Sequence, residues 1–248
     1  MTTRLLMIVA LLAAATMPGS ASIILNGGFE LPAIGINAAS PTSSIPNWTI
    51  VGGTGVTLLL SNEYIEGVPG NNDEIYFQTP FGSQFLDLTG VGYVGGLGIS
   101  QTVNVVAGQR YAINFAVGNV GFGGNTAYCV VPRVGGVCPP GQLVDYYSEA
   151  ARVRLVVGTT DFGVFQNSML AGSTTRGVNW EVQPTVYYLA TTTGPVNVTF
   201  YHDNRADNFA GLDNVSMREA PIPEPATVGM LGLGLVGLGL MRKRARRS

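Results

Sequence analysis

Few side chains in this chain have the chemistry of a catalytic group. The single histidine is His202, in FYHDN, and the two cysteines are Cys129 and Cys138. The sequence contains no G-x-S-x-G elbow and no H-E-x-x-H helix motif, which are the usual signatures of serine hydrolases and zinc proteases. A glycosidase needs only two carboxylates about 5 to 10 Å apart, but nothing marks one pair of acids for that role. We therefore predict that the protein is not an enzyme, with His202 at a strand end bonded to a carboxylate or carbonyl.

Acidic residues could instead bind a cation. Asp203, Asp207 and Asp213 lie in HDNRADNFAGLDN, at spacings of four and six residues. These spacings do not fit the D-x-[DN]-x-[DN]-G calcium loop. We interpret the segment as a polar turn between the last two strands, and Asp73 and Glu74 as part of a solvated loop.

Aromatic side chains are the best candidates for sugar binding, because the C–H face of a pyranose stacks on a ring while polar groups bond its hydroxyls. Those on predicted loops or strand edges are Tyr64, Tyr76, Phe81, Tyr93, Phe122, Tyr128, Tyr146 and Tyr147. From these we select four as the predicted carbohydrate-binding residues, Tyr64, Tyr93, Tyr128 and Tyr146. They are scattered in the sequence, and Trp180 could be either core or surface.

Short strands must position these residues. Turn residues recur about every ten residues between short apolar segments, which is typical of a sandwich or barrel. In YAINFAV, four alternate residues share one face, as in a half-buried strand. The clearest strands begin at Trp48, Val56, Ser83, Ile99, Arg110, Ala151, Val186, Val196 and Leu212. Since no long amphipathic helix is evident, we predict an all-β fold, an antiparallel β-sandwich.

The N-terminus has the pattern of a secretory signal. Arg4 precedes an apolar run from Leu5 to Ala15, and Gly19-Ser20-Ala21 supplies small residues for signal peptidase. The run is too short for a stable membrane span. We therefore predict a signal peptide over residues 1–21 and an exported domain over residues 22–220, long enough for one sizeable core.

The predicted exported segment is acidic. Between Ser22 and Ile222 it has seven arginines, no lysine and fourteen acids, a net charge of about −7. It lacks the basic patch expected of a nucleic-acid binder. We therefore exclude nucleic acid as a partner.

The cysteines lie close together in YCVVPRVGGVCPPG. In exported proteins two nearby cysteines usually pair. We predict a disulfide between Cys129 and Cys138, since a metal site would require more sulfur or imidazole ligands than the chain offers.

The C-terminus carries an apolar segment that is short for an anchor. Ala226 to Met241 contains 16 uncharged residues. As a helix it would be about 24 Å long, less than the roughly 30 Å of a bilayer's hydrocarbon. Its five glycines further weaken the helix. The basic residues that follow it, and that would stay on the cytoplasmic side, are Arg242, Lys243, Arg244, Arg246 and Arg247.

This terminus resembles the PEP-CTERM sorting signal of exopolysaccharide-producing Gram-negative bacteria. The tripeptide Pro223-Glu224-Pro225, the short helix at 226–241 and the basic tail occur in the same order within residues 221–248. The resemblance implies recognition by an exosortase, cleavage near the tripeptide and delivery to the cell surface or matrix after transient anchoring in the inner membrane. A permanent anchor is the alternative.

The predicted exported domain resembles galactose-binding-like jelly-roll domains, which include carbohydrate-binding modules and the plant DUF642 proteins. The residues that carry the resemblance are NGGFELP, NW, GISQTVNVVAGQRYAINFAV and GLDNVSM. It implies a jelly-roll sandwich in which Trp48 is core. Many such domains hold a structural calcium ion, which would assign Glu30 and Asp213 as ligands, completed by backbone carbonyls.

Together these features predict a non-enzymatic exported protein that binds polysaccharide. Its partners would be signal peptidase, exosortase, the inner membrane transiently, and a glycan. The alternative is a structural matrix protein without a specific sugar site, and less favoured is a glycoside-active enzyme. The binding prediction depends on the fold resemblance, and one fold supports many functions.

Overall fold

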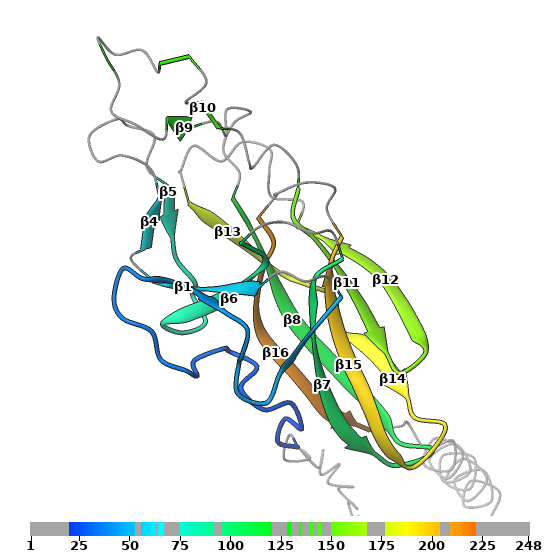
Figure 1. The fold of residues 1–248 in the computed structure, drawn as a ribbon. Helices are drawn as coiled ribbons and strands as arrows, with labels where there is room; N and C mark the ends of the chain where they lie inside the picture. Colours follow the sequence, from blue (N-terminus) through cyan, green and yellow to red (C-terminus); the bar gives the residue numbers. More distant parts are fainter. Residues whose placement is uncertain are drawn as a thin grey trace, which may run out of the picture.

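Two antiparallel sheets face each other across the main hydrophobic core in the computed structural model (Figure 1). The structure describes residues 20–52, 56–62, 64–66, 75–91, 96–120, 128–129, 134, 139–140, 143–144, 150–167, 177–203 and 209–221. Among these residues there is no helix, and none therefore that could cross a membrane. The predicted all-β sandwich is confirmed.

The larger sheet has seven strands. Its order is β1 (Ala39–Thr42), β3 (Val56–Ser61), β6 (Gln84–Val91), β16 (Gly211–Ala220) and β8 (Arg110–Val120), with β13 (Val178–Val182) and β14 (Val186–Leu189) both paired to β8. The last strand in the sequence, β16, therefore lies in the middle of this sheet. The residues that flank β16 in the sequence are therefore attached to a central strand of the sheet.

The smaller sheet has five strands. Its order is β12 (Thr160–Gln166), β11 (Arg152–Val157), β15 (Gly194–His202), β7 (Gly98–Val105) and β2 (Thr49–Val51). Two further hairpins pair β4 (Tyr64–Glu66) with β5 (Ile75–Phe77) and β9 (Tyr128–Cys129) with β10 (Leu143–Val144).

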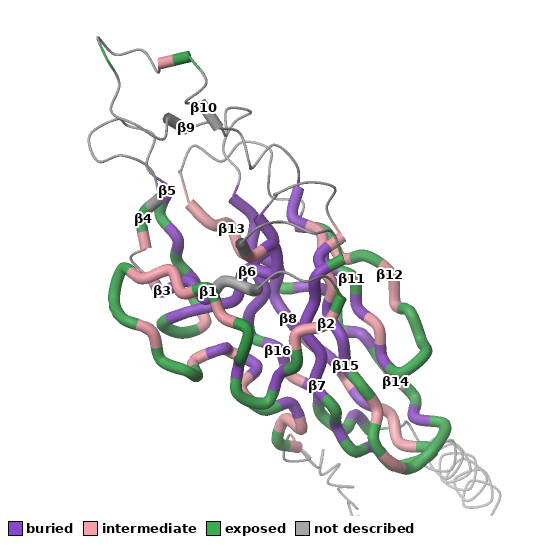
Figure 2. The backbone as a smooth tube through the Cα atoms, viewed as in Figure 1, coloured by how far each residue is buried: buried purple, intermediate pink, exposed green. Residues whose placement is uncertain are grey.

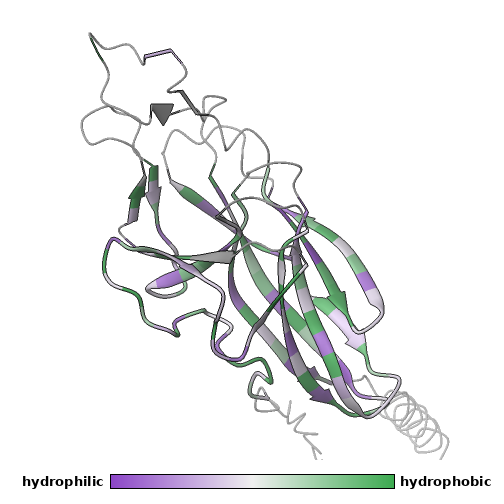
Figure 3. Cartoon of the chain, viewed as in Figure 1, coloured by the Kyte–Doolittle hydropathy of each residue, from purple (hydrophilic) through white to green (hydrophobic). Residues whose placement is uncertain are grey.

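Alternate residues of the central strands fill the space between the sheets. On β8, Tyr111, Ile113, Phe115 and Val117 are all buried, as the alternation predicts. The Phe115 ring packs edge-on against Phe200 of the opposite sheet, with centroids 5.1 Å apart. Figure 2 shows the resulting column of buried backbone, and Figure 3 the alternation of hydropathy along the same strands.

All nine predicted strands are present, and the structure adds others. The strand β1, ASPT, has no apolar alternation and contains Pro41, which an edge strand tolerates. The strand β12 is also at an edge, and its side chains are half-buried or exposed along its whole length. Edge strands of this kind lack the pattern that identifies a strand from sequence.

Candidate functional site

The segment NGGFELP forms a closed loop against the core. Asn26 adopts a positive φ of 50°, donates from its side-chain amide to the carbonyl of Leu31 (2.8 Å) and accepts from the Leu31 N–H (3.1 Å). Phe29, inside this loop, is fully buried and packs on Trp48, with ring centroids 5.6 Å apart. Trp48 is buried, as predicted, and donates to the carbonyl of Asn26 at 3.0 Å. The loop therefore fixes the direction of the residue after Phe29, which is Glu30.

A bulge in β16 receives this loop. The register between β16 and β8 shifts between Asp213 and Ser216, and Asn214 adopts a positive φ of 54°. The Val215 N–H donates to the carbonyl of Gly27 at 2.9 Å, and a Cβ on Gly27 would lie 1.9 Å from the Val215 oxygen. Only glycine allows the loop to approach the bulge this closely.

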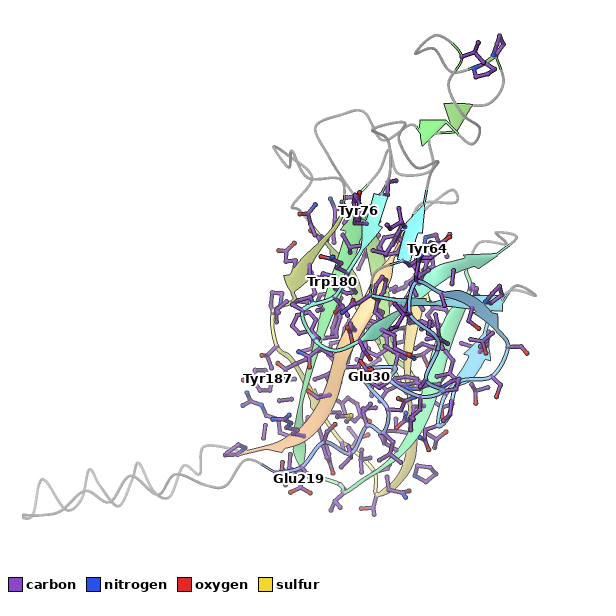
Figure 4. All side chains as sticks on the ribbon, turned by 90° about the vertical axis from the view of Figure 1, so that its left-hand side faces the viewer. Glu30, Tyr64, Tyr76, Trp180, Tyr187 and Glu219 are labelled. Atoms are coloured by element: carbon purple, nitrogen blue, oxygen red, sulfur yellow. The ribbon has the colours of Figure 1, made fainter. Side chains whose placement is uncertain are left out.

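This packing brings Glu30 and Asp213 to the same place. A Cβ placed on Gly28 would stand 3.8 Å from Asp213 Oδ1 and 3.9 Å from Glu30 Cγ. The Asp213 carboxylate and the Glu30 side chain thus both lie beside Gly28, although they come from the last and first segments of the domain. Figure 4 shows Glu30 near the middle of the sandwich.

Asp213 is completely buried. Its Oδ2 accepts a hydrogen bond from Thr79 Oγ1 (2.5 Å), and its Oδ1 accepts one from the Asn214 N–H (2.6 Å). Burial raises the pKa of Asp213 to about 7, and the negative charge of Glu30 adds to the rise. The two hydrogen bonds lower this pKa, but by less than burial raises it. Among the described residues, no arginine forms an ion pair with either carboxylate.

Glu30 is held by the start of β6. Its Oε1 accepts from the Ser83 N–H at 2.9 Å, and Ser83 Oγ donates to its Oε2. A Cβ on Gly82 would lie 1.9 Å from Glu30 Oε1, so the carboxylate occupies the space that this glycine leaves open.

The side-chain atoms that could bind a metal ion at this site are all oxygens, the ligands that Ca²⁺ prefers. The Asp213 carboxylate bonds the Thr79 hydroxyl and the Glu30 carboxylate bonds the Ser83 hydroxyl, and neither carboxylate has a basic partner among the described residues. Among the described residues, no three His, Cys, Asp or Glu side chains lie together so that they could hold a metal ion. Backbone carbonyls or water would therefore have to complete a calcium shell. The chemistry of the donor set fits calcium, and the ligand role of Glu30 and Asp213 stays a prediction.

A second candidate site is a hollow of about 470 Å³ on the solvent side of the five-stranded sheet. Its size is within the range of small-ligand sites, about 300 to 1,000 Å³. The residues that line it come from β11, β12, the end of β15 and the approach to β7: Gly96, Arg154, Val156, Asp161, Tyr201, His202 and Asp203.

Tyr201 supplies an aromatic surface in this hollow. Its neighbour Phe200 points into the core, so the Tyr201 side chain points outward. Gly98 is its cross-strand partner on β7, and a Cβ there would lie 2.7 Å from Tyr201 Cδ1. The ring therefore lies over the glycine, which holds it against the sheet.

Charged groups lie beside Tyr201 on the side of β11 and β12. Arg154 is its cross-strand partner on β11 and bonds Asp161, with Nε 3.1 Å from Oδ2. The hydrogen bond from Arg154 lowers the pKa of Asp161, which keeps this carboxylate ionised. Arg152 forms a second ion pair with Asp203 at 2.9 Å. The hollow thus combines the ring of Tyr201 with arginine and aspartate side chains that are paired with each other.

Of the four predicted sugar-binding tyrosines, only the side chain of Tyr64 belongs to the described residues, and Tyr64 does not line this hollow. Tyr64 lies on β4, half-buried, with its ring 5.5 Å from that of Phe77. Tyr93 and Tyr146 lie outside the described residues, and only the backbone of Tyr128 is described. Among the described residues that line the hollow, Tyr201 is the only aromatic one, and the loop-based prediction did not select it.

Trp180 and His202 have structural contacts. Trp180 packs on Phe85, at 5.1 Å between ring centroids, and donates to the carbonyl of Gln78 at 2.6 Å. His202 is buried and ends β15, as predicted.

Several predicted features lie outside the described residues. They are the signal peptide before Ser20, the side chains of Cys129 and Cys138, the tripeptide Pro223-Glu224-Pro225, and the tail with Arg242, Lys243, Arg244, Arg246 and Arg247.

Residues 221–244 match the model of the PEP-CTERM protein-sorting motif. This match confirms the sorting signal predicted at the C-terminus. It indicates an exported protein that is processed at the membrane, and it implies an exosortase as the processing enzyme. No curated protein matches the chain.

Solved structures of similar fold include two cyclases and a carbohydrate-binding module. A Stig cyclase, Fisc, from Fischerella sp. TAU is 17% identical over 82% of this chain and 99% of its own, with a TM-score of 0.51. The apo form of a cyclase from Fischerella sp. is 16% identical over 82% and 98%, with a TM-score of 0.53. TmCBM61, solved with β-1,4-galactotriose, is 14% identical over 81% and 100%, with a TM-score of 0.44. At these identities the likeness to the cyclases concerns the fold, an antiparallel β-sandwich that spans most of this chain.

Proposed function

We propose that this exported protein binds polysaccharide, without turnover, at the hollow around Tyr201. The observation that carries the proposal is the outward ring of Tyr201, which lies over Gly98 and beside the ion pair of Arg154 and Asp161. A pyranose could stack its C–H face on the ring and direct its hydroxyls to the outer edge of the Arg154–Asp161 pair.

The charges favour a neutral sugar over an anionic one. Arg154, which lines the hollow, is already paired with Asp161, and Asp203, which also lines it, is paired with Arg152. An anionic group would have to displace a carboxylate from its partner. A hydroxyl can add a hydrogen bond to either member of a pair without breaking it.

The remaining parts of the proposal follow from the sorting motif and the fold. An exosortase of a Gram-negative bacterium would cleave near Pro223-Glu224-Pro225 and release the domain to the cell surface or matrix. A calcium ion held by Glu30 and Asp213 would join the first segment of the domain to its last strand.

The test is binding of the exported protein to a glycan array and to exopolysaccharide. We expect Tyr201→Ala to weaken binding about tenfold, because one stacked ring contributes about 0.5–1.5 kcal/mol beyond the area it buries. The control is Tyr187→Ala, since Tyr187 is exposed on the other sheet. Saturable binding that Tyr201→Ala leaves unchanged would move the site elsewhere. Absence of binding by the unsubstituted protein would favour the alternative, a structural matrix protein that acts through display and self-association.

A further inference from the structure

One end of the sandwich gathers both termini of the described domain. We call this end the terminal pole: the turn Val106–Gln109, the turn 190–193, and the residues that flank them on β8, β14 and β16. The Gly108 N–H donates to the carbonyl of Ala190 (2.8 Å), and Gln109 Nε2 donates to the carbonyl of Ala220 (3.3 Å). The two turns and the end of β16 therefore form one connected surface.

The N-terminal segment reaches the same pole. Ser20 Oγ donates to the carbonyl of Glu219 at 3.2 Å, and the Ile23 N–H donates to the carbonyl of Met217 at 2.8 Å. The chain before Ser20 and the chain after Pro221 both leave from this end. Both predicted membrane-directed segments are thus connected to the terminal pole.

The connection on the C-terminal side is short. Four residues separate Pro221 from the apolar segment that starts at Ala226. A fully extended linker of this length spans at most about 18 Å. The headgroup layer takes up about 5–7 Å of that distance. While the apolar segment is in a membrane, the terminal pole must lie beside the headgroups.

The surface of the pole has the composition of a membrane interface. Val106 and Leu189 are 55% and 57% exposed, and the Tyr187 ring, 50% exposed, covers the Arg110 guanidinium at 3.7 Å. Tyrosine is enriched at the headgroup level because its ring is apolar and its hydroxyl polar. Figure 4 shows Tyr187 in the half of the sandwich that holds Glu219, away from Tyr64 and Tyr76.

The charge at the pole differs in sign from that of the domain. The pole carries Arg110 and Arg218 against the single acid Glu219, whereas the predicted exported segment has a net charge of about −7. Anionic headgroups would repel most of the domain and attract this end. Electrostatics and apolar exposure therefore favour the same orientation.

We propose that the terminal pole rests on the lipid headgroups while the C-terminal segment anchors the chain, before that segment is removed. The hollow around Tyr201 then lies away from the membrane. Along β15, Gly194 lies at the pole and Tyr201 near the opposite end, about 23 Å away at the usual rise per residue. The anchored form could bind a glycan before it is released.

The test uses the full chain, reconstituted through its own C-terminal segment into vesicles of phosphatidylethanolamine and phosphatidylglycerol with brominated acyl chains. The probe is Leu189→Trp, and the matched control is Val182→Trp. Val182 is 60% exposed and flanks β8 on the same side, but its partner is Ala116 instead of Arg110, about 20 Å along the strand. The unsubstituted chain gives the background from Trp48 and Trp180.

We expect bromine to quench the added fluorescence of Leu189→Trp at least about twofold more than that of Val182→Trp, because bromine quenches only at near contact. Tyr187→Trp is a second probe at the pole and should behave like Leu189→Trp. Equal quenching at positions 189 and 182 would overturn the proposal. The same result is expected if a protein partner, instead of lipid, covers the pole. Failure of the chain to float with the vesicles would overturn it as well, because the anchor would then be absent.

Discussion

The buried carboxylate of Asp213 makes the metal-free domain sensitive to pH. Its pKa is about 7 in the folded state against 3.8 as the ordinary value. Between these values the folded state binds a proton that the unfolded state has lost, so the free energy of unfolding falls as pH rises. A difference of about three pKa units corresponds to about 4 kcal/mol, lost between about pH 4 and about pH 7 and constant above.

Asp213→Asn should remove this dependence. The asparagine oxygen can accept from the Asn214 N–H, and its amide can donate to Thr79 Oγ1, as a protonated carboxyl would. In chelator at about pH 8, the variant should be more stable than the unsubstituted domain by up to about 4 kcal/mol, and at about pH 4 the two should be equal. The measurement is urea unfolding across this pH range, with Glu219→Gln, an exposed charge, as the control.

The difference between the variant and the unsubstituted domain isolates Asp213, because other titrating groups contribute to both. A difference that stays constant with pH would show that the carboxyl does not titrate in this range. A variant that is less stable at high pH would show that the ionised form is favoured without a cation. Either result would refute the reasoning from burial.

Calcium should reverse the effect in the unsubstituted domain only. A cation beside Glu30 and Asp213 favours both ionised carboxylates, and a ligand at a hundred times its Kd adds about 2.7 kcal/mol. Asp213→Asn should gain much less. If calcium leaves the unsubstituted domain unchanged at about pH 8, neither acid is a ligand, and the pH prediction stands without the metal.

Two other substitutions test the support of Glu30 and the sorting signal. Gly82→Ala should destabilise by about 1 kcal/mol in urea unfolding, because its Cβ would displace the Glu30 carboxylate from its hydrogen bonds with Ser83. Gly35→Ala, with open space around it, should stay within about 0.5 kcal/mol. Glu224→Ala should accumulate as an unprocessed species in the inner-membrane fraction on an immunoblot, and normal release of that variant would contradict exosortase processing.

The core could be predicted from the sequence because it depends on alternation. Tyr111, Ile113 and Phe115 repeat at every second position, and burial of one face is the main constraint on such a strand. The edge strands β1 and β12 could not be predicted, since solvent on one side leaves their side chains unconstrained. Their place in the sheets depends on pairing with β3 and β11.

The two candidate sites differed in how far the sequence revealed them. Glu30 and Asp213 were predicted as ligands through the resemblance to galactose-binding-like domains, which short motifs at the two ends of the domain carry. The hollow was missed because Arg154, Asp161 and Tyr201 meet only through the register of β11 with β12 and β15. A signal was nevertheless present: Val196, Val198 and Phe200 alternate inward, which turns Tyr201 outward, beside the outward Arg154. The prediction missed Tyr201 because it considered only aromatic residues on predicted loops or strand edges.

The position of β16 connects the sorting signal to the fold. This strand lies between β6 and β8, and its bulge at Asp213 holds the NGGFELP loop. Its last residue, Ala220, is buried and pairs with Arg110, whereas the matched motif begins at residue 221. Cleavage near Pro223-Glu224-Pro225 would therefore remove none of the β16 ladder and expose no described core residue. The domain that leaves the membrane can keep the fold, and both candidate sites, that it had while anchored.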